Sequence, residues 1–101
     1  MKSRVDLDAV LVDILGSEFV YFQPPNGTKM KYPCIVYELS QIRKRMAENK
    51  AYTVLKSYTV TFIHRDPDSP ITDKILELPY CRFDRRFITD NLYHDVFTLY
   101  Y

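Results

Sequence analysis

Residue types that several functional classes require are scarce in this sequence. It contains two glycines, Gly16 and Gly27, and no tryptophan. Phosphate-binding loops such as G-x-x-x-x-G-K and G-x-G-x-x-G need closely spaced glycines, so nucleotide binding by these routes is excluded. No apolar run reaches the length of about 18 residues that a membrane span needs, and no secretory signal is recognisable. We therefore expect no membrane partner.

An excess of one charge is also missing. Fourteen Lys and Arg residues against thirteen Asp and Glu residues leave a net charge of +1. This balance provides no global positive field that would draw the chain to nucleic acid or to anionic lipid. Local basic clusters are the electrostatic signal that remains.

Cysteine is limited to Cys34 and Cys81, which we expect to be reduced thiols of a cytosolic protein. Together with His64 and His94 they contain the ligand types of a zinc site. Successive members of this set are 30, 17 and 13 positions apart, whereas compact zinc sites show close pairs such as C-x2-C. We expect both thiols to be small buried hydrophobes, and no metal site.

No combination of residues typical of catalysis is evident. Asp66 and Asp68 flank Pro67, but their position ahead of Pro70 fits loop and helix-cap chemistry better than a carboxylate pair. No G-x-S-x-G motif and no nucleophile–base pair stands out. The sequence therefore predicts a protein that is not an enzyme, with no catalytic residues and no cofactor.

The length of 101 residues allows one domain, residues 1–101, and a hydrophobic fraction of 47% favours a compact core. Apolar residues recur at helical spacing over 4–15, with Ser3 and Asp6 placed for a capping box and Gly16 for a left-handed C-cap. A second, short helix is predicted over 70–78, with Asp68 or Ser69 as N-cap.

The remaining segments are strand-like. The alternation of apolar and polar residues is clearest over 52–64, where Tyr58, Val60 and Phe62 share one face. Further strands are expected at 19–22, at 34–40 with an extension toward residue 45, and at 81–88 and 92–101 around a turn at 89–91. We predict an α+β two-layer sandwich, with a mainly antiparallel sheet of four to five strands and two helices on one face.

Two basic clusters permit alternative functions. One lies at the predicted hairpin tip, residues 43–50, and the other at residues 82–86, with aromatic residues interleaved. Cations beside aromatic rings suit RNA, which leaves a small RNA-binding or regulatory α+β protein as an alternative, although no RNP-like motif supports it. The clusters also fit charged residues that protect strand edges from aggregation, or docking of the tip on an acidic protein.

The order of features resembles small tail terminator proteins of long-tailed bacteriophages, also called tail completion or head–tail joining proteins. The resemblance rests on the run Tyr-Pro-Cys-Ile-Val-Tyr-Glu at 32–38, the polar hairpin, the run Tyr-Thr-Val-Thr-Phe at 58–62, the short helix and the terminal hairpin. It spans essentially the whole chain. The segment 82–86 matches no signature of that family.

The resemblance implies a structural virion protein of the tail or neck, present in the host cytoplasm during assembly. Such a protein forms a homo-oligomeric ring, usually of six copies, that caps the tail tube protein and joins it to the head–tail connector protein. Double-stranded DNA would pass through the lumen without sequence-specific binding. A strongly cationic inner wall would hold phosphates, and the near-zero net charge is compatible with its absence.

Nine Tyr and six Phe residues exceed what two helices on one sheet face are expected to cover, so we expect a neighbouring copy to bury part of the strand surface. The predicted ring interface consists of Val36, Ile63, Leu99, Tyr100 and Tyr101. The predicted docking surface for an adjoining ring is the hairpin tip, with Arg43, Lys44, Arg45, Met46, Lys50 and Tyr52.

Overall fold

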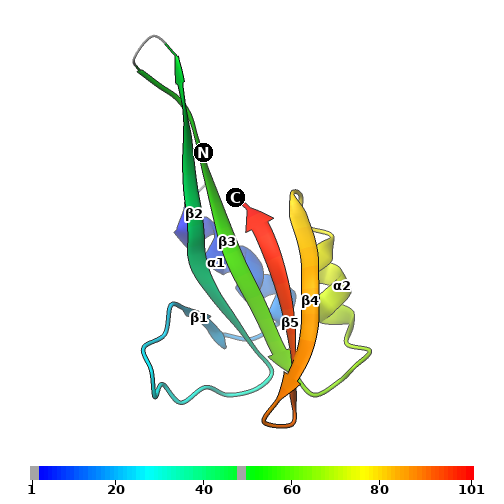
Figure 1. Ribbon diagram of the computed structural model, residues 1–101. Coiled ribbons are helices and arrows are strands. Elements are labelled where there is room, and N and C mark those ends of the chain that lie inside the picture. Colours follow the sequence, from blue (N-terminus) through cyan, green and yellow to red (C-terminus); the bar gives the residue numbers. More distant parts are fainter. Residues whose placement is uncertain (1–2, 48–49) are drawn as a thin grey trace.

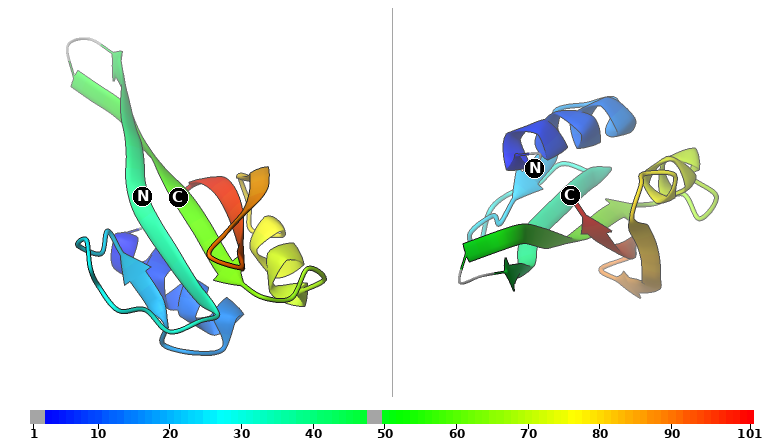
Figure 2. Two further views of the ribbon diagram at one scale, coloured as in Figure 1. Left: turned by 60° about the horizontal axis from the view of Figure 1, so that its bottom comes forward. Right: turned by 90° about the horizontal axis from the view of Figure 1, so that it is seen from above.

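A five-stranded sheet carries two helices on one face (Figure 1) in the computed structural model, which describes residues 3–47 and 50–101. The elements follow in the order α1 (Arg4–Leu15), β1 (Val20–Phe22), β2 (Cys34–Ala47), β3 (Lys50–His64), α2 (Pro70–Leu76), β4 (Cys81–Thr89) and β5 (Leu92–Tyr100). Figure 2 shows both helices on the same side of the sheet. The predicted α+β two-layer class is confirmed.

The strand order is β1-β2-β3-β5-β4. Strands β2, β3, β5 and β4 pair antiparallel, while β1 pairs parallel with β2, in register from Val20 with Ile35 to Phe22 with Tyr37. The sequence did not indicate the parallel pair. It forms because the segment 23–33 is long enough to return the chain to the end of the sheet at which β1 began.

Both helices begin as their sequences predict. The Ser3 hydroxyl accepts a hydrogen bond from the Asp6 N–H at 3.2 Å, and the Asp6 carboxylate accepts one from the Ser3 N–H, which completes the capping box. Gly16 ends α1 in the left-handed conformation, with φ of 77°. Ser69 caps α2, which ends at Leu76, two residues before the predicted end. Neither described helix has the length and hydropathy that a membrane crossing requires.

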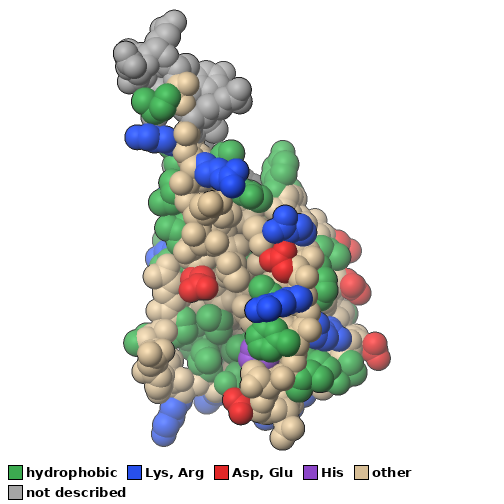
Figure 3. All heavy atoms as spheres, viewed as in Figure 1, with side chains coloured by type: hydrophobic (Ala, Val, Ile, Leu, Met, Phe, Trp, Pro, Cys, Tyr) green, Lys and Arg blue, Asp and Glu red, His purple; other side chains and the backbone are tan. Residues whose placement is uncertain are grey.

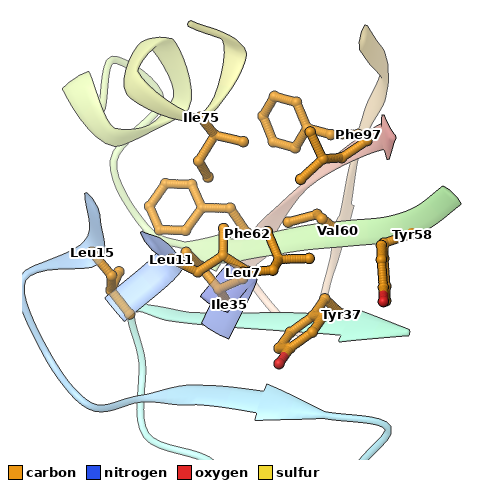
Figure 4. Packing of buried hydrophobic residues seen from close by; sticks show 11 residues of the cluster. Leu7, Leu11, Leu15, Ile35, Tyr37, Tyr58, Val60, Phe62, Ile75 and Phe97 are labelled. Carbon is orange, nitrogen blue, oxygen red and sulfur yellow. The ribbon is translucent and has the colours of Figure 1, made fainter. Parts of the chain in front are cut away.

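The main core lies between the helices and the sheet (Figure 4). The predicted inner face of β3, with Tyr58, Val60 and Phe62, is confirmed, since all three are buried. The fully buried hydrophobic members of this core come from both helices and from β2, β3 and β5: Leu7, Leu11, Ile35, Tyr37, Val60, Phe62, Ile75, Phe97 and Leu99.

Tyr37 ties α1 to the sheet and retains a partner for its buried hydroxyl. The hydroxyl donates to Asp8 Oδ2 at 2.6 Å and accepts from Arg4 Nη1 at 3.2 Å. Burial, followed by the hydrogen bond to Asp8, raises the pKa of Tyr37 to about 12. The ring is therefore neutral, and one of the nine tyrosines is fully buried with its polar end satisfied.

A smaller buried cluster lies on the opposite face of the sheet. It contains Cys34, Ile63 and Leu92, with Met30 and Val36 packed against it. Met30 belongs to the segment between β1 and β2, so this segment covers part of the face that the helices leave open.

Helix α1 provides a matched test of the core. We expect Leu11→Ala to lower the free energy of unfolding by about 2–5 kcal/mol, because Leu11 is fully buried and its truncation leaves a cavity. Val5→Ala on the same helix should change it by less than about 0.5 kcal/mol, because Val5 is 65% exposed. Urea titration followed by circular dichroism measures both; equal effects would contradict the assigned helix face.

Candidate functional site: the two-stranded arm and the groove at its base

The outer halves of β2 and β3 extend beyond the rest of the sheet as a two-stranded ribbon (Figure 1). We call the described part of this ribbon, residues 39–47 and 50–56, the arm. The molecule measures 52 × 28 × 23 Å, and its radius of gyration is 14.7 Å. A compact chain of this length would have a radius of gyration of about 12.7 Å. The arm accounts for this elongation.

The arm leaves more surface in solvent than a compact protein of this mass exposes. The accessible surface is 7003 Å², whereas a compact 12 kDa monomer exposes about 6,000 Å². The difference of about 1,000 Å² is close to the ~800 Å² that each partner buries in a standard protein–protein interface.

Within the described residues the arm edges have partners only at their base, where the Lys56 carbonyl accepts a hydrogen bond from the Tyr101 N–H and the Leu39 N–H donates one to Gln23 Oε1. β1 pairs with β2 only from Ile35 to Tyr37. β5 pairs with β3 only from Ser57 to His64, which leaves residues 50–55 without a strand on that side. An isolated two-stranded ribbon is only marginally stable in water, and unpaired edges are templates for another strand. The arm is therefore the part of the sheet that a partner most readily completes.

Apolar side chains on the arm lie in solvent. Leu39, Ile42, Met46 and Leu55 are 37%, 54%, 50% and 51% exposed. Basic side chains lie among them, and Figure 3 shows these green and blue side chains along the arm below the grey atoms. The mixture of apolar and cationic groups is typical of a surface that a protein partner covers.

The structure places the predicted tip residues as follows. Arg43, Lys44 and Met46 lie on the arm with exposed side chains, and Arg43 Nε donates to Gln41 Oε1 at 3.2 Å. The side chains of Arg45, Lys50 and Tyr52 lie outside the described residues.

A groove of about 600 Å³ lies at the base of the arm, where β5 ends. The three tyrosines of this groove also line a second hollow of about 210 Å³. The residues that line the larger groove are Arg43, Leu55, Lys56, Tyr80, Tyr100 and Tyr101. Arm residues and terminal tyrosines thus form a single concave, largely aromatic surface, which sequence reasoning had not brought together.

Tyr80 is the most exposed large hydrophobic side chain at this groove, at 83%. Its φ is 60°, in the left-handed region that non-glycine residues rarely occupy, and its carbonyl accepts a hydrogen bond from the Tyr100 N–H at 3.1 Å. An aromatic ring held in solvent on a strained backbone suits a contact that forms with another molecule.

The predicted ring interface is wrong at two of its five positions. Leu99 is fully buried in the main core and Ile63 is 6% exposed in the smaller cluster, so the chain itself already covers both. The expectation failed because Leu99 faces the layer of the helices, and because the segment between β1 and β2 covers Ile63 on the other face. Val36 and Tyr101 are half-buried, and Tyr100 is 38% exposed, so these three retain surface.

The basic cluster at 82–86 is largely neutralised by the chain's own carboxylates. Arg82 Nε lies 2.9 Å from Asp84 Oδ1, and Arg86 pairs with the buried carboxylate of Asp95. Arg85 lies over the Phe87 ring at 5.2 Å. Two of the three guanidinium groups are thus committed to internal pairs, which weakens this segment as a nucleic-acid surface.

Asp95 is the centre of a buried polar network that the sequence did not indicate. It is fully buried, and its Oδ2 accepts hydrogen bonds from Thr72 at 2.7 Å and Arg86 Nη2 at 2.9 Å. His64 Nε2 lies 2.8 Å from the same oxygen. The other ring nitrogen of His64, Nδ1, is buried and has no hydrogen-bond partner among the described residues. The network joins α2, β3, β4 and β5.

The remaining candidate groups do not converge on a reactive centre. Within the described residues no three His, Cys, Asp or Glu side chains are grouped so that they could hold a metal ion. Burial raises the pKa of Cys34 to about 11, and burial together with the nearby Asp84 charge raises that of Cys81 to about 11. Both thiols are therefore protonated, and unreactive as nucleophiles, near neutral pH.

Comparisons with protein-family models, with curated proteins and with solved structures give no match for this chain. The arm and its groove are therefore interpreted from their own geometry.

Replacing the buried carboxylate tests the network. We expect Asp95→Asn to lower the free energy of unfolding by about 3 kcal/mol, because Arg86 and His64 lose a buried anionic partner. Asp90→Asn is the control, since Asp90 is exposed and Asn tolerates its φ of 53°. Chemical denaturation at pH 7 compares the variants; similar losses for both would contradict the role of Asp95.

The same substitution also tests how the free energy of unfolding depends on pH. Burial alone would raise the pKa of Asp95, but hydrogen bonds from Arg86, Thr72 and His64 outweigh it and hold the pKa below its usual range. A lowered folded-state pKa gives stability that is present above the unfolded value of about 3.9 and is lost as the pH falls toward the folded value. The difference in free energy of unfolding between wild type and Asp95→Asn should therefore be constant from about pH 7 to pH 5 and should become smaller below about pH 4. A difference that widens on acidification would contradict this.

Proposed function

We propose that this chain is a structural virion protein that forms a ring, caps the tail tube of a long-tailed bacteriophage and joins it to the head connector. The observation that carries the proposal is the arm, a ribbon with two unpaired edges and exposed apolar side chains. Folding of a single chain gives no reason to retain such a ribbon, because it buries little and exposes surface. A partner that covers this surface would explain why the chain keeps the ribbon.

The surface of the arm supports a joining role in particular. It projects away from the helices, and its residues Arg43, Lys44 and Met46 are exposed. A ring subunit that stops tube growth must present one surface complementary to the tube end and a different one to the head. An elongated subunit with a projecting arm separates these surfaces in space.

Ring closure requires a heterologous interface, in which one patch meets a different patch of the next copy. Since Ile63 and Leu99 are covered within the chain, the surface left for this contact includes the outer edge of β4, where Phe83, Phe87 and Ile88 are 40%, 38% and 65% exposed. The contact therefore involves the edges of the sheet more than its open face.

The alternative of an RNA-binding or regulatory protein has less support. Of its two basic clusters, the one at 82–86 is mostly paired internally, which leaves the arm. The open face of the sheet carries Thr59, Thr61 and Thr98, and its partly exposed ring, Phe87, is already stacked on His94 at 4.8 Å between centroids.

Oligomer mass is the direct test of ring formation. We expect native mass spectrometry of the purified chain, alone and with the assembled tail tube, to show a closed oligomer of the 12.0 kDa subunit, six copies in the simplest case. Negative-stain images should show the same species at the tube end. A monomer in both conditions would contradict the proposal.

Charge reversal on the arm tests joining separately. The double variant Arg43→Glu/Arg45→Glu should leave rings intact and block attachment to the adjoining ring, because like charges replace an attraction at the contact. The matched control is Lys29→Glu/Lys31→Glu, which reverses two exposed charges in the segment between β1 and β2. Infectious particles counted after assembly with each variant should fall only for the arm variant; unchanged infectivity would end the proposed role of the arm.

A further inference from the structure

We propose that the free β3 edge of the arm binds an extended, acidic segment of a partner protein as an added β-strand, seated in the groove at the base of the arm. The inference rests on the proposed function only for the identity of that partner, the protein of the adjoining ring. The mode of binding follows from the backbone, the groove and the charges.

The backbone of β3 presents free hydrogen-bonding groups to this groove. The Tyr101 N–H donates to the Lys56 carbonyl at 3.1 Å, so Lys56 directs its backbone groups toward the β5 side. Successive residues of a strand direct these groups to alternate sides, which places the N–H and C=O of Val54 on the same edge as those of Lys56. No described strand pairs with β3 on this side between residues 50 and 55, so an incoming strand would continue the ladder where β5 stops.

The groove surrounds the edge of the sheet rather than lying on one of its faces. Arg43 and Leu55 are paired across β2 and β3 and share one face, whereas Lys56 is paired with Ile42 and lies on the other. All three of Arg43, Leu55 and Lys56 line the same groove. A hollow that is lined from both faces is the space that another strand of the sheet would fill, and its side chains would alternate between Leu55 and Lys56.

The charge of the site selects an acidic occupant. Between residues 39 and 56 the sequence has five cations, with Glu48 as its one carboxylate. The described residues that line the groove include Arg43 and Lys56 and no acidic residue. A segment that carries Asp or Glu at alternate positions would pair with Lys56 on one face of the sheet, while its apolar residues contact Leu55 and Tyr100 on the other.

A second copy of this chain fits the edge poorly. The long free edges described in this chain are those of the arm itself and of β4. Two basic arms brought together repel each other, and the one carboxylate of β4, Asp84, is paired with Arg82, so β4 offers no free acidic partner to the cations of the groove. A nucleic acid would satisfy the cations, but it lacks the alternating donors and acceptors at peptide spacing that the β3 edge offers.

The experiment uses a defined probe. An end-blocked synthetic peptide, Thr-Glu-Val-Glu-Val-Glu-Val-Thr, is titrated into the full-length chain, and a peptide with Lys in place of each Glu is the matched control. Amide hydrogen exchange followed by NMR reports strand addition directly. We expect the acidic peptide to bind at least about tenfold more tightly than its lysine counterpart, and to slow exchange of the Val54 amide, because that N–H becomes hydrogen-bonded.

The matched variants are Val54→Pro and Val54→Ala. The proline removes the N–H that faces the free edge, where proline is tolerated, and should weaken peptide binding about tenfold. The alanine keeps that N–H and should change binding by less than about threefold. Thermal unfolding of both variants verifies that they are folded, and the exchange measurement on the wild type decides the question if Val54→Pro is not.

Several outcomes would overturn the proposal. One is equal binding of the two peptides, and another is binding that does not slow exchange of the Val54 amide. A third is slowed exchange of that amide without peptide, increasing with protein concentration, which would indicate a second copy at the edge. Tighter binding of an oligothymidylate than of the acidic peptide would indicate nucleic acid. Ring formation is measured without any peptide. If the chain forms rings but does not bind the acidic peptide, strand addition is refuted and the proposed function is not.

Discussion

The pairing of β2 with β3 is the constraint on which the rest of the structure depends. The ladder runs from Cys34 with Ile63 at the covered end to Ala47 with Lys50 at the outer end, with register shifts between Leu39 and Gln41 and between Arg45 and Met46. In its inner half, alternation places Tyr37, Val60 and Phe62 under the helices. In its outer half the two strands extend beyond the rest of the sheet, so Ile42 on one face and Leu55 on the other both lie in solvent. The core and the docking surface therefore lie at opposite ends of the same pair of strands, β2 and β3.

Internal polar pairs determine which surfaces remain for a partner. Asp95 and Asp84 bind Arg86 and Arg82, so β4 presents less free positive charge than its sequence implies. Hydrogen bonds to Tyr37 anchor α1 over β2 and hold the inner half of the ribbon in place. The described arm has no such internal carboxylate partner for Arg43, which bonds to Gln41. Free charge and free backbone edges therefore coincide on the arm.

Local sequence signals predicted most of the fold. The capping box of Ser3 and Asp6, the left-handed Gly16, the Ser69–Pro70 start of α2 and the turn at Asp90 and Asn91 are encoded within a few residues, and each is present. The period-two pattern over Tyr58, Val60 and Phe62 defined the inner face of β3 in the same way. The site was predicted in part, since Arg43, Lys44 and Met46 lie exposed on the arm.

Sequence alone thus determined the elements, their caps and the buried face of β3, because these depend on neighbours a few positions apart. Tertiary structure alone decided the parallel pairing of β1, the burial of Ile63 and Leu99, the Asp95 network and the groove that unites Leu55, Tyr80 and Tyr100. These features join residues tens of positions apart. Their contacts depend on how the chain closes its loops, and periodicity along the sequence carries no information about that closure.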